Sequence, residues 1–405
     1  MPSSLPDFPR ARALLLLAAL AMTGCGGTRP EADAGATVPA PPADRIRVAT
    51  FNTSLYSDEA GGLVARLRGD DAPARRIAAT IQHVRPDVLL LNEFDYDEAG
   101  EAAALFVGRY LGEGQHGQPP IEYPHVYYAP VNTGVPSGLD LGGDGVVGGD
   151  DRARGNDAWG YGLHPGQYGM LVLSRFPIDA AAARTFRLLR WSTMPAALAP
   201  LDPSTMTPHY PAPVWAQLRL SSKSHWDLPI ETPAGRLHRL AAHPTPPAFD
   251  GPEKRNVLRN HDEIRLWADD LDDAPSDATW LCDDAGRCGG LPANERFVVV
   301  GDYNADPRDG LSLPGAIAQL LEHPRVQRLA APRSAGAAAA AAAGDLAAHD
   351  TAQFGRENLR VDYVLPSTGL HVRDSGVFWP RAGEPGSDWV DATDHRLVWV
   401  DLAVD

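Results

Sequence analysis

The chain has 405 residues, of which 44% are hydrophobic and 22% are charged, as in an ordinary globular protein with a large core. Asp and Glu outnumber Lys and Arg by 52 to 36, which gives a formal net charge of −16. Since the chain has no basic patch or Arg-rich arm, we expect no stable nucleic-acid partner. A nuclease is still compatible with this charge, because a bound metal ion supplies positive charge locally.

The N-terminus has the composition of an export signal. Arg10 and Arg12 precede the apolar run Leu14–Met22, which is too short to span a bilayer as a stable helix. The residues Met22-Thr23-Gly24-Cys25 resemble a bacterial lipobox in which Cys25 carries the lipid. We therefore expect residues 1–24 to be a signal peptide with a lipobox. A plain secretory signal with a chance cysteine is the alternative.

Residues 25–44 are expected to be a lipidated cysteine followed by a flexible tether, because residues 26–44 are rich in Pro, Ala and Gly. The residue after Cys25 is Gly26 and not an aspartate, so the resemblance to bacterial lipoproteins implies an outer-membrane destination if the cell is Gram-negative. The expected location is the cell envelope, with the protein held to the outer membrane or facing the periplasm. Residues 45–405 are then left to form the folded domain.

Cysteine usage agrees with export. The chain has 3 cysteines, and if Cys25 carries lipid, Cys282 and Cys288 remain, close in sequence and outside the cytosol. This predicts a disulfide between them. A zinc site is the weaker alternative, because no second cysteine pair and no histidine with finger-like spacing accompany them.

Strand-like runs recur from Arg45 to the end of the chain and outnumber the helical patterns. The predicted strands are Ile46–Phe51, Asp87–Leu91, Met170–Leu173, Leu237–Ala242, Phe297–Val300, Val361–Leu365 and Leu397–Leu402, and the predicted helices include Ala72–Val84 and Arg255–Leu271. Strands and helices do not alternate strictly, which favours a mixed-sheet sandwich flanked by helices. Residues 132–166 and 195–213 have the composition of insertions. The alanine run between Ser334 and Gly344 is compatible with a short helix or a mobile loop.

Polar residues suited to metal or phosphate binding stand at the ends of several predicted strands, and three more lie inside a strand (Asp362) or just before the last one (Asp394 and His395). They are Asn52, Glu93, His243, Asp302, Asn304, Asp362, Asp394 and His395. Each residue taken alone is compatible with a cap or a turn. Asp302 and Asn304, for example, follow the run Val298–Val300 and the strand-breaking Gly301, where an Asx-type turn is common. They would also point the same way along an extended segment, where both could serve a cation or a polar transition state.

As an ordered set, these residues resemble the endonuclease/exonuclease/phosphatase superfamily, which has the deoxyribonuclease-I-like fold. The family's GDFN motif corresponds to Gly301-Asp302-Tyr303-Asn304, its SDH motif to Thr393-Asp394-His395, and its QE pair to Asn92-Glu93. The resemblance covers nearly all of residues 45–405. It implies an α/β (α+β) fold, a four-layer α-β-β-α sandwich with the active site at one edge of its two sheets.

The resemblance also implies a metal-dependent phosphoester hydrolase. Glu93, Asn52 and Asp394 offer the oxygen ligands that Mg²⁺ prefers, and Mn²⁺ is the alternative ion. The metal would act as a Lewis acid and neutralise charge that develops on the phosphoryl oxygens.

Proton transfer is expected from His243 and His395, because imidazole titrates near neutral pH. The resemblance implies that Asp302 and Asn304 bind the phosphate and the attacking water, and that Asp362 orients His243 and fixes its tautomer. Which histidine serves the nucleophile and which the leaving group is left open.

Two positions are candidates for substrate contact. The family places a polar residue just before the strand that begins at Met170, and a one-residue slip in register exchanges Gln167 for Tyr168, so both are candidates. Arg255 and Arg259 lie one helical turn apart and could meet an anionic substrate. The alternative is a solvated helix face with a Glu/Arg pair.

The segment 140–151 is similar to a calcium loop. Asp140, Asp144 and Asp151 stand at its first, fifth and twelfth positions, but Gly142 supplies no oxygen at the third. We expect either a weak Ca²⁺ site or a flexible Gly/Asp loop near the rim of the active site.

We therefore expect a lipid-anchored, metal-dependent phosphodiesterase or phosphatase that acts on a small or lipid-derived phosphoester and is a monomer. A secreted nuclease of the same fold is the first alternative, and acidity disfavours it mildly. A surface binding lipoprotein that kept the fold and lost the chemistry is the second. Retention of every catalytic-type residue argues against it, since the fold alone does not require them.

Overall fold

The computed structural model describes residues 44–272, 278–340 and 347–404, all within one compact unit. The predicted signal peptide, Cys25 and most of the tether lie outside these residues, so export and lipidation stay predictions. Within the described ranges, no helix combines the length and apolarity needed to cross a bilayer.

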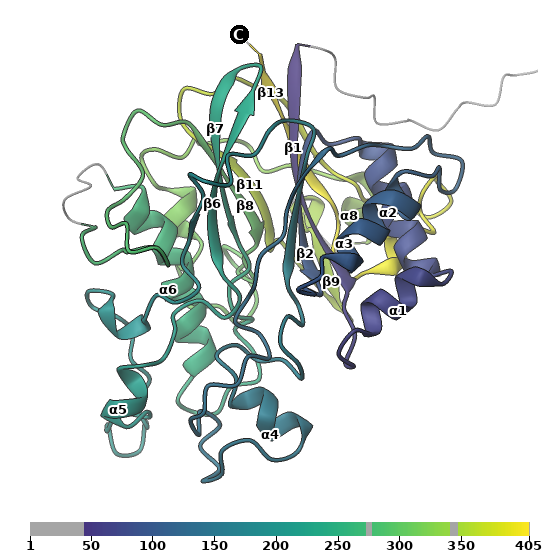
Figure 1. The fold of residues 1–405 in the computed structure, drawn as a ribbon. Helices are drawn as coiled ribbons and strands as arrows, with labels where there is room; N and C mark the ends of the chain where they lie inside the picture. Colours follow the sequence, from purple (N-terminus) through teal and green to yellow (C-terminus); the bar gives the residue numbers. More distant parts are fainter. Residues whose placement is uncertain (1–43, 273–277, 341–346, 405) are drawn as a thin grey trace, which may run out of the picture. The chain divides into compact units, whose positions relative to one another are not determined.

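Two β-sheets lie face to face at the centre (Figure 1). The first, in spatial order, contains β12 (Val372–Val377), β13 (Val398–Ala403), β1 (Arg45–Leu55), β2 (Val88–Phe94), β4 (Met170–Ser174) and β3 (His125–Tyr127). The second contains β11 (Asp362–Pro366), β8 (Phe297–Asp302), β7 (Gly235–Ala242), β6 (His225–Thr232) and β5 (Arg184–Thr185). A separate hairpin pairs β9 (Ala352–Phe354) with β10 (Glu357–Leu359).

Helices cover the outer faces of both sheets, with α1, α2 and α3 on the first and α6 on the second (Figure 1). The α-helices are α1 (Gly62–Arg68), α2 (Ala72–Val84), α3 (Glu101–Leu105), α4 (Asp151–Asn156), α5 (Ala212–Trp215), α6 (Arg255–Asp270), α7 (Ala318–Leu321) and α8 (Ala335–Ala340). A π-helical segment, η1 (Phe106–Leu111), continues α3, and 3₁₀ turns occur at η2 (Trp191–Thr193), η3 (Ala347–His349) and η4 (Val390–Ala392).

The alternation of side chains along each strand builds three hydrophobic layers. In β8, Val298 and Val300 face the first sheet, whereas Val299 packs in the layer that contains Trp267 of α6. In β2, Leu90 faces the second sheet, and Leu89 packs against the helices on the other side. Both sheets are therefore buried on both faces. The predicted four-layer α-β-β-α sandwich is confirmed.

All the predicted strands and both predicted helices are present; the helix Ala72–Val84 has the predicted bounds, and the ends of the other elements differ by at most four residues. Among the described residues, the sequence reading missed six strands, which are β3, β5, β6, β9, β10 and β12. β6 contains Asp227 and Pro229, and β12 contains Asp374 and Gly376, residues that are depleted in strands. Hydrogen-bonded pairing of β6 with β7, and of β12 with β13, makes both segments strands despite the low strand preference of these residues. In the alanine run, residues 335–340 form the helix α8, and the rest lies outside the described residues.

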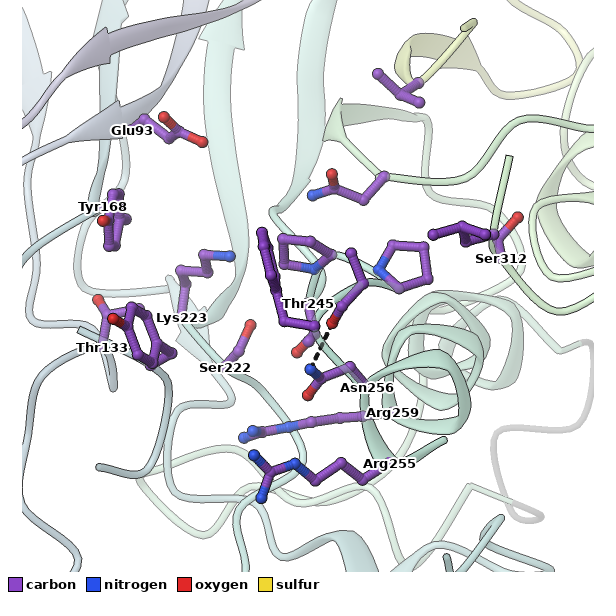
Figure 2. A pocket seen from close by; sticks show the side chains of 18 of the residues that line it. Glu93, Thr133, Tyr168, Ser222, Lys223, Thr245, Arg255, Asn256, Arg259 and Ser312 are labelled. Carbon is purple, nitrogen blue, oxygen red and sulfur yellow. Dashed lines mark hydrogen bonds between the residues drawn. The ribbon is translucent and has the colours of Figure 1, made fainter. Parts of the chain in front are cut away.

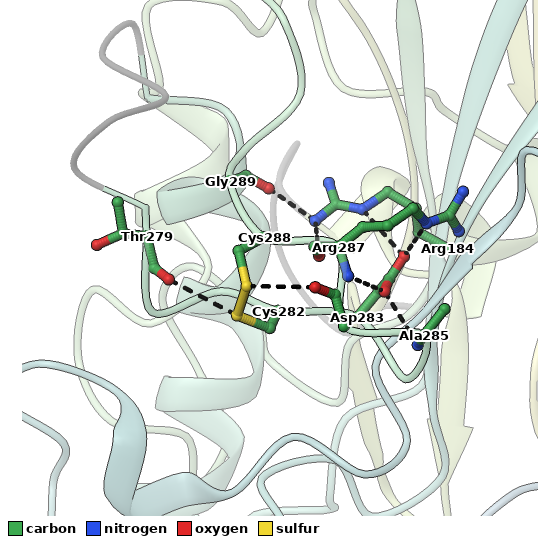
Figure 3. Close-up of a disulfide and its surroundings, with 9 residues drawn as sticks. Arg184, Thr279, Cys282, Asp283, Ala285, Arg287, Cys288 and Gly289 are labelled. Carbon is green, nitrogen blue, oxygen red and sulfur yellow. Dashed lines mark hydrogen bonds and ion pairs between the residues drawn. A yellow bond between two sulfur atoms is a disulfide. The ribbon is translucent and has the colours of Figure 1, made fainter.

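The predicted disulfide between Cys282 and Cys288 is present (Figure 3). It closes a loop in which the Asp283 carboxylate accepts hydrogen bonds from the backbone N–H groups of Ala285 and Arg287, at 3.0 and 2.8 Å. Arg184 in β5 lies 3.7 Å from the same carboxylate, so the loop is attached to the edge of the second sheet.

Candidate active site

The topology brings the polar strand ends together at one edge of the sandwich. β1 and β2 run parallel, as do β7 and β8, so each pair ends at the same edge of its sheet. β11 runs antiparallel to β8 with Asp362 opposite Asp302, and β13 begins at this edge just after His395. Strand direction thus places residues from six segments at one site.

Asp302 is the centre of this cluster and is 1% exposed. One carboxylate oxygen, Oδ1, accepts a hydrogen bond from the backbone N–H of Asn304 at 2.9 Å, as in an Asx turn. The other, Oδ2, accepts a hydrogen bond from Asn52 Nδ2 at 3.0 Å and lies 3.4 Å from His243 Nε2 and 3.6 Å from His395 Nε2. The Asx turn is therefore present and uses Oδ1, while Oδ2 faces the other polar residues of the cluster, where the functional role predicted for Asp302 would place it.

Gly301 permits this placement. Its φ is 153°, and a Cβ at this position would lie 2.0 Å from the carbonyl oxygen of Ala242 in β7. Only glycine allows β7 and β8 to approach so closely where the two strands end.

His395, not His243, is oriented by Asp362, which corrects the expectation from sequence. His395 Nδ1 lies 2.9 Å from Asp362 Oδ2, and Thr351 Oγ1 donates a second hydrogen bond to the same oxygen at 2.8 Å. His243 Nδ1 is buried and has no hydrogen-bond partner among the described residues. The physical reason is the strand register, which places Asp362 beside the segment that precedes β13.

Burial and neighbouring charges perturb the titratable groups of the cluster. Burial raises the pKa of Asp302 to about 6, although His395 opposes this shift. Burial lowers the pKa of His395, but the carboxylates of Asp362 and Asp302 outweigh it and raise the pKa to about 10. The pKa of His243 lies well below its usual value because of burial, Lys223 and His395.

Glu93, His243 and Asp302 are suited to bind a divalent cation. Their ligand atoms lie within 4.8 Å of one another. Burial raises the pKa of both Glu93 and Asp302, so the two ionised carboxylates are costly without a cation beside them. Asn52 lies next to this set, because its Nδ2 donates a hydrogen bond to Asp302 Oδ2. Asp394 lines the same cavity, but its side chain is 49% exposed and it does not belong to the converging set.

Strained backbone is concentrated around the cluster. Ser54, Glu93, Tyr168 and Asn304 all have positive φ, between 48° and 56°, and all four line one cavity. Such conformations are unfavourable for residues other than glycine and are common at functional sites.

The cluster opens into a cavity of about 910 Å³ (Figure 2). Glu93, Asn304 and His395 line its catalytic end. Leu141 and Tyr161 from the insertion 132–166 also line the cavity. Further lining residues from this insertion, from the loop before α5 and from the start of α6 are Thr133, Arg152, Asn156, Tyr210, Arg255, Asn256 and Arg259.

The register ambiguity between Gln167 and Tyr168 is resolved by the structure. Gln167 is completely buried, and its Nε2 donates hydrogen bonds to Ser57 O at 2.8 Å and Asp58 Oδ1 at 3.1 Å. Tyr168 lines the cavity and packs on Tyr56, with the ring centroids 4.6 Å apart. Gln167 therefore fixes a loop, and only Tyr168 is placed to contact a substrate.

Arg255 and Arg259 border the cavity, yet both guanidinium groups are used to hold loops. Arg255 Nη1 donates to Leu141 O at 2.7 Å. Arg259 Nη2 donates to Trp159 O at 2.7 Å, and its Nε donates to Leu220 O at 2.8 Å. Both residues line the cavity, and Arg255 Nε lies 3.8 Å from Glu253 Oε1, so the structure contains a feature of each sequence alternative. In addition, both residues attach the insertion 132–166 to α6.

The residues of the predicted calcium loop do not converge. Asp140 Oδ1 accepts the backbone N–H of Gly143 at 2.6 Å, and Asp151 pairs with Arg154 at 2.7 Å. Asp144 accepts the backbone N–H of Val146 at 3.0 Å. Among the described residues, the only converging sets of metal-ligating side chains contain Asp302. The Ca²⁺ expectation is therefore not supported, because local backbone hydrogen bonds occupy these carboxylates.

Lys223 lines the cavity and was missed by the sequence reading. Lys223 and Lys254 are the only lysines of the chain, among 36 Lys and Arg residues. The signal in the sequence that could have singled out this residue is a lysine, rare in this chain, inside the polar run Ser221-Ser222-Lys223-Ser224.

A model described as the endonuclease/exonuclease/phosphatase family matches residues 49–395. Similar solved structures include an endonuclease/exonuclease/phosphatase from Beutenbergia cavernae, with 19% identity and a TM-score of 0.48 over 89% of this chain and 72% of that one. Sphingomyelinase C from Streptomyces griseocarneus has 15% identity and a TM-score of 0.42 over 88% and 99% of the two chains. A variant of beta toxin from Staphylococcus aureus with bound magnesium ions has 10% identity and a TM-score of 0.43 over 88% and 99%. No curated protein matches the chain.

Proposed function

Because the chain belongs to the endonuclease/exonuclease/phosphatase family, we propose that it is a Mg²⁺- or Mn²⁺-dependent hydrolase of small or lipid-derived phosphoesters, attached to the cell envelope by a lipid on Cys25. Membership of the family supports phosphoester hydrolysis. The substrate class, the metal and the anchor are the proposed parts.

The cavity is the observation that carries the choice of substrate. The catalytic cluster lies at one end of a space of about 910 Å³, within the size range of small-molecule sites. The insertion 132–166 builds part of the wall and is attached to α6 by Arg255 and Arg259. A duplex needs an accessible surface that neutralises many phosphates, whereas this chain carries a net charge of −16. These features favour a small or flexible phosphoester over a nucleic acid.

The metal, when bound by Glu93 and Asp302 with His243 beside them, would polarise the phosphoryl group and stabilise its negative charge. Asp302 Oδ2 lies between Asn52 and the Nε2 atoms of His243 and His395, where it can orient a water molecule and accept its proton.

His395 is held for proton transfer. Its Nδ1 proton is donated to Asp362, which leaves Nε2 directed toward Asp302 and the cavity. Asn304 and Tyr168 line the same end and can contact the bound ester.

The purified protein should be assayed with Mg²⁺, Mn²⁺ or a chelator against four substrates: bis-p-nitrophenyl phosphate, p-nitrophenyl phosphate, phospholipid vesicles and plasmid DNA. We expect metal-dependent cleavage of at least one small ester or phospholipid, and a loss of about 10²–10⁴-fold in Asp302→Ala and His395→Ala. Circular dichroism should show that both variants keep the fold. Cleavage confined to plasmid DNA would favour the nuclease alternative, and no cleavage of any substrate would favour a binding protein.

A further inference from the structure

The side chain of Lys223 is buried beside the catalytic cluster without a partner of its own. The residue is 5% exposed and lines the cavity. No hydrogen bond or ion pair joins its ammonium group to another residue in the described part of the chain, although the charges of Glu263, Glu93 and Asp302 act on it. Figure 2 shows this group extending from the wall toward the middle of the cavity, on the side of Glu93 and Tyr168. A buried charge that lacks a partner is costly, so its presence calls for a ligand or a compensating field.

The backbone around Lys223 is fixed on both sides. The carbonyl of Lys223 accepts a hydrogen bond from Asn132 N at 2.9 Å. Glu263 in α6 accepts hydrogen bonds from Ser222 N and from Thr245 N, each at 2.6 Å. A Cβ on Gly160 of the insertion would lie 1.9 Å from Ser222 O, so the insertion packs tightly on this segment. The backbone from which the Lys223 side chain extends is therefore held in place by α6 and by the insertion.

The charge of Lys223 acts on the catalytic cluster. It opposes the upward shift in the pKa of Glu93 and contributes to the downward shift in the pKa of His243. Burial lowers the pKa of Lys223, and the carboxylates of Glu263, Glu93 and Asp302 oppose this shift. An anion bound at the catalytic end of the cavity would thus lie within the field of this ammonium group.

We propose that Lys223 is a phosphate-binding residue whose ammonium group donates hydrogen bonds to a non-bridging oxygen of the phosphoester bound beside Glu93 and His395. This inference rests on the proposed function and deepens it, because it assigns a ligand group to the cation. A lysine presents a compact charge with three donors, whereas the planar fork of an arginine needs a wider approach. This difference accounts for a lysine here in a chain that otherwise uses arginine almost throughout.

The two-lysine composition allows a direct test. The chelator-treated protein is labelled with isotope-enriched lysine, and its side-chain NMR signals are followed while inorganic phosphate is added. Lys254 is exposed, lies outside the cavity lining and serves as the internal control. Lys254→Arg assigns the two signals. We expect the Lys223 signal to shift in a saturable manner and the Lys254 signal to stay in place.

Variants extend the test. Lys223→Met should weaken phosphate binding about 10- to 100-fold, the range expected when a charge-assisted hydrogen bond is lost, and Lys223→Arg should restore it only in part. Lys254→Met should bind phosphate like the wild type. In the hydrolysis assay, Lys223→Met should raise KM or lower kcat for the ester that the wild type cleaves.

The possible outcomes separate the two proposals. A Lys223 signal that does not respond to phosphate, or equal phosphate affinity in Lys223→Met and the wild type, would overturn the assignment even if the enzyme is active. A lower melting temperature in Lys223→Met with unchanged phosphate affinity would overturn it too, and would assign the lysine to charge balance among Glu93, Asp302 and Glu263. A phosphate-dependent Lys223 signal in a protein that cleaves no ester would support the binding site and contradict the proposed function.

Discussion

Replacing Asp362 with asparagine should reduce kcat while preserving the fold. Asp362 Oδ2 lies 2.9 Å from His395 Nδ1 in a site where the carboxylate is 1% exposed. A buried hydrogen bond to a charged group contributes about 1.5–3 kcal/mol, so we expect kcat to fall roughly 10- to 100-fold. Asparagine keeps the shape and one oxygen, so it can still accept from Thr351 Oγ1.

A second effect of this substitution has a defined sign. The pKa of His395 is lowered by burial and raised by Asp362 and then Asp302. Removing the Asp362 charge must lower the pKa of His395, so the ring loses its proton at lower pH. NMR titration of the histidine side chains should show this shift, and any limb of the pH–rate profile that reports His395 should move the same way.

Asp227→Asn provides the matched control. Asp227 Oδ1 lies 2.7 Å from His238 Nδ1, so it forms a comparable buried pair, but neither residue lines the cavity. We expect this variant to change the melting temperature and leave kcat within about twofold of the wild type, because the pair does not touch the site. Wild-type turnover in Asp362→Asn would refute the assigned role, and so would an equal loss of kcat in the two variants.

Four further predictions concern the metal, pH, the core and the anchor. Glu93→Gln should weaken metal affinity, so activity should return in part at high Mg²⁺; activity that does not respond to Mg²⁺ concentration would contradict this. Burial raises the pKa of Asp270 to about 7, so its stabilising effect is full below about pH 4 and is lost as the pH rises to 7. Between these pH values, Asp270 should make the free energy of unfolding fall by up to about 1.4 kcal/mol per pH unit, and Asp270→Asn should remove this contribution. Urea unfolding at several pH values measures it, and an equal slope of free energy against pH in the variant and the wild type would refute the argument. Arg239 is buried, donates Nη2 to Ala49 O and leaves Nε and Nη1 without partners in the described chain, so Arg239→Met should keep or raise the free energy of unfolding. Cys25→Ser should abolish labelling by a fatty acid and release the protein from membranes, whereas label that persists would exclude this anchor.

Local signals in the sequence were sufficient to predict many of the strands and two of the helices, and the resemblance to the family implied their four-layer order. A β-branched run such as Val298–Val300 predicts a buried strand from its own composition, and Gly301 marks its end. The helix over Ala72–Val84 follows from its apolar periodicity and has the same bounds in the structure. β6 escaped prediction because Asp227 and Pro229 lower its local preference, and only pairing with β7 makes it a strand.

Within the site, the sequence determined which residues are candidates for the chemistry, because their ordered set resembles one family. It did not determine their partners. The choice of His395 over His243 as the partner of Asp362 depends on the register between β11 and β8, and a register is a property of two segments far apart in the chain. Lys223 shows the same limit. Its residue type is visible in the sequence, but its burial beside Glu93 exists only once the insertion and α6 close around it, since burial is set by contacts that no single segment contains.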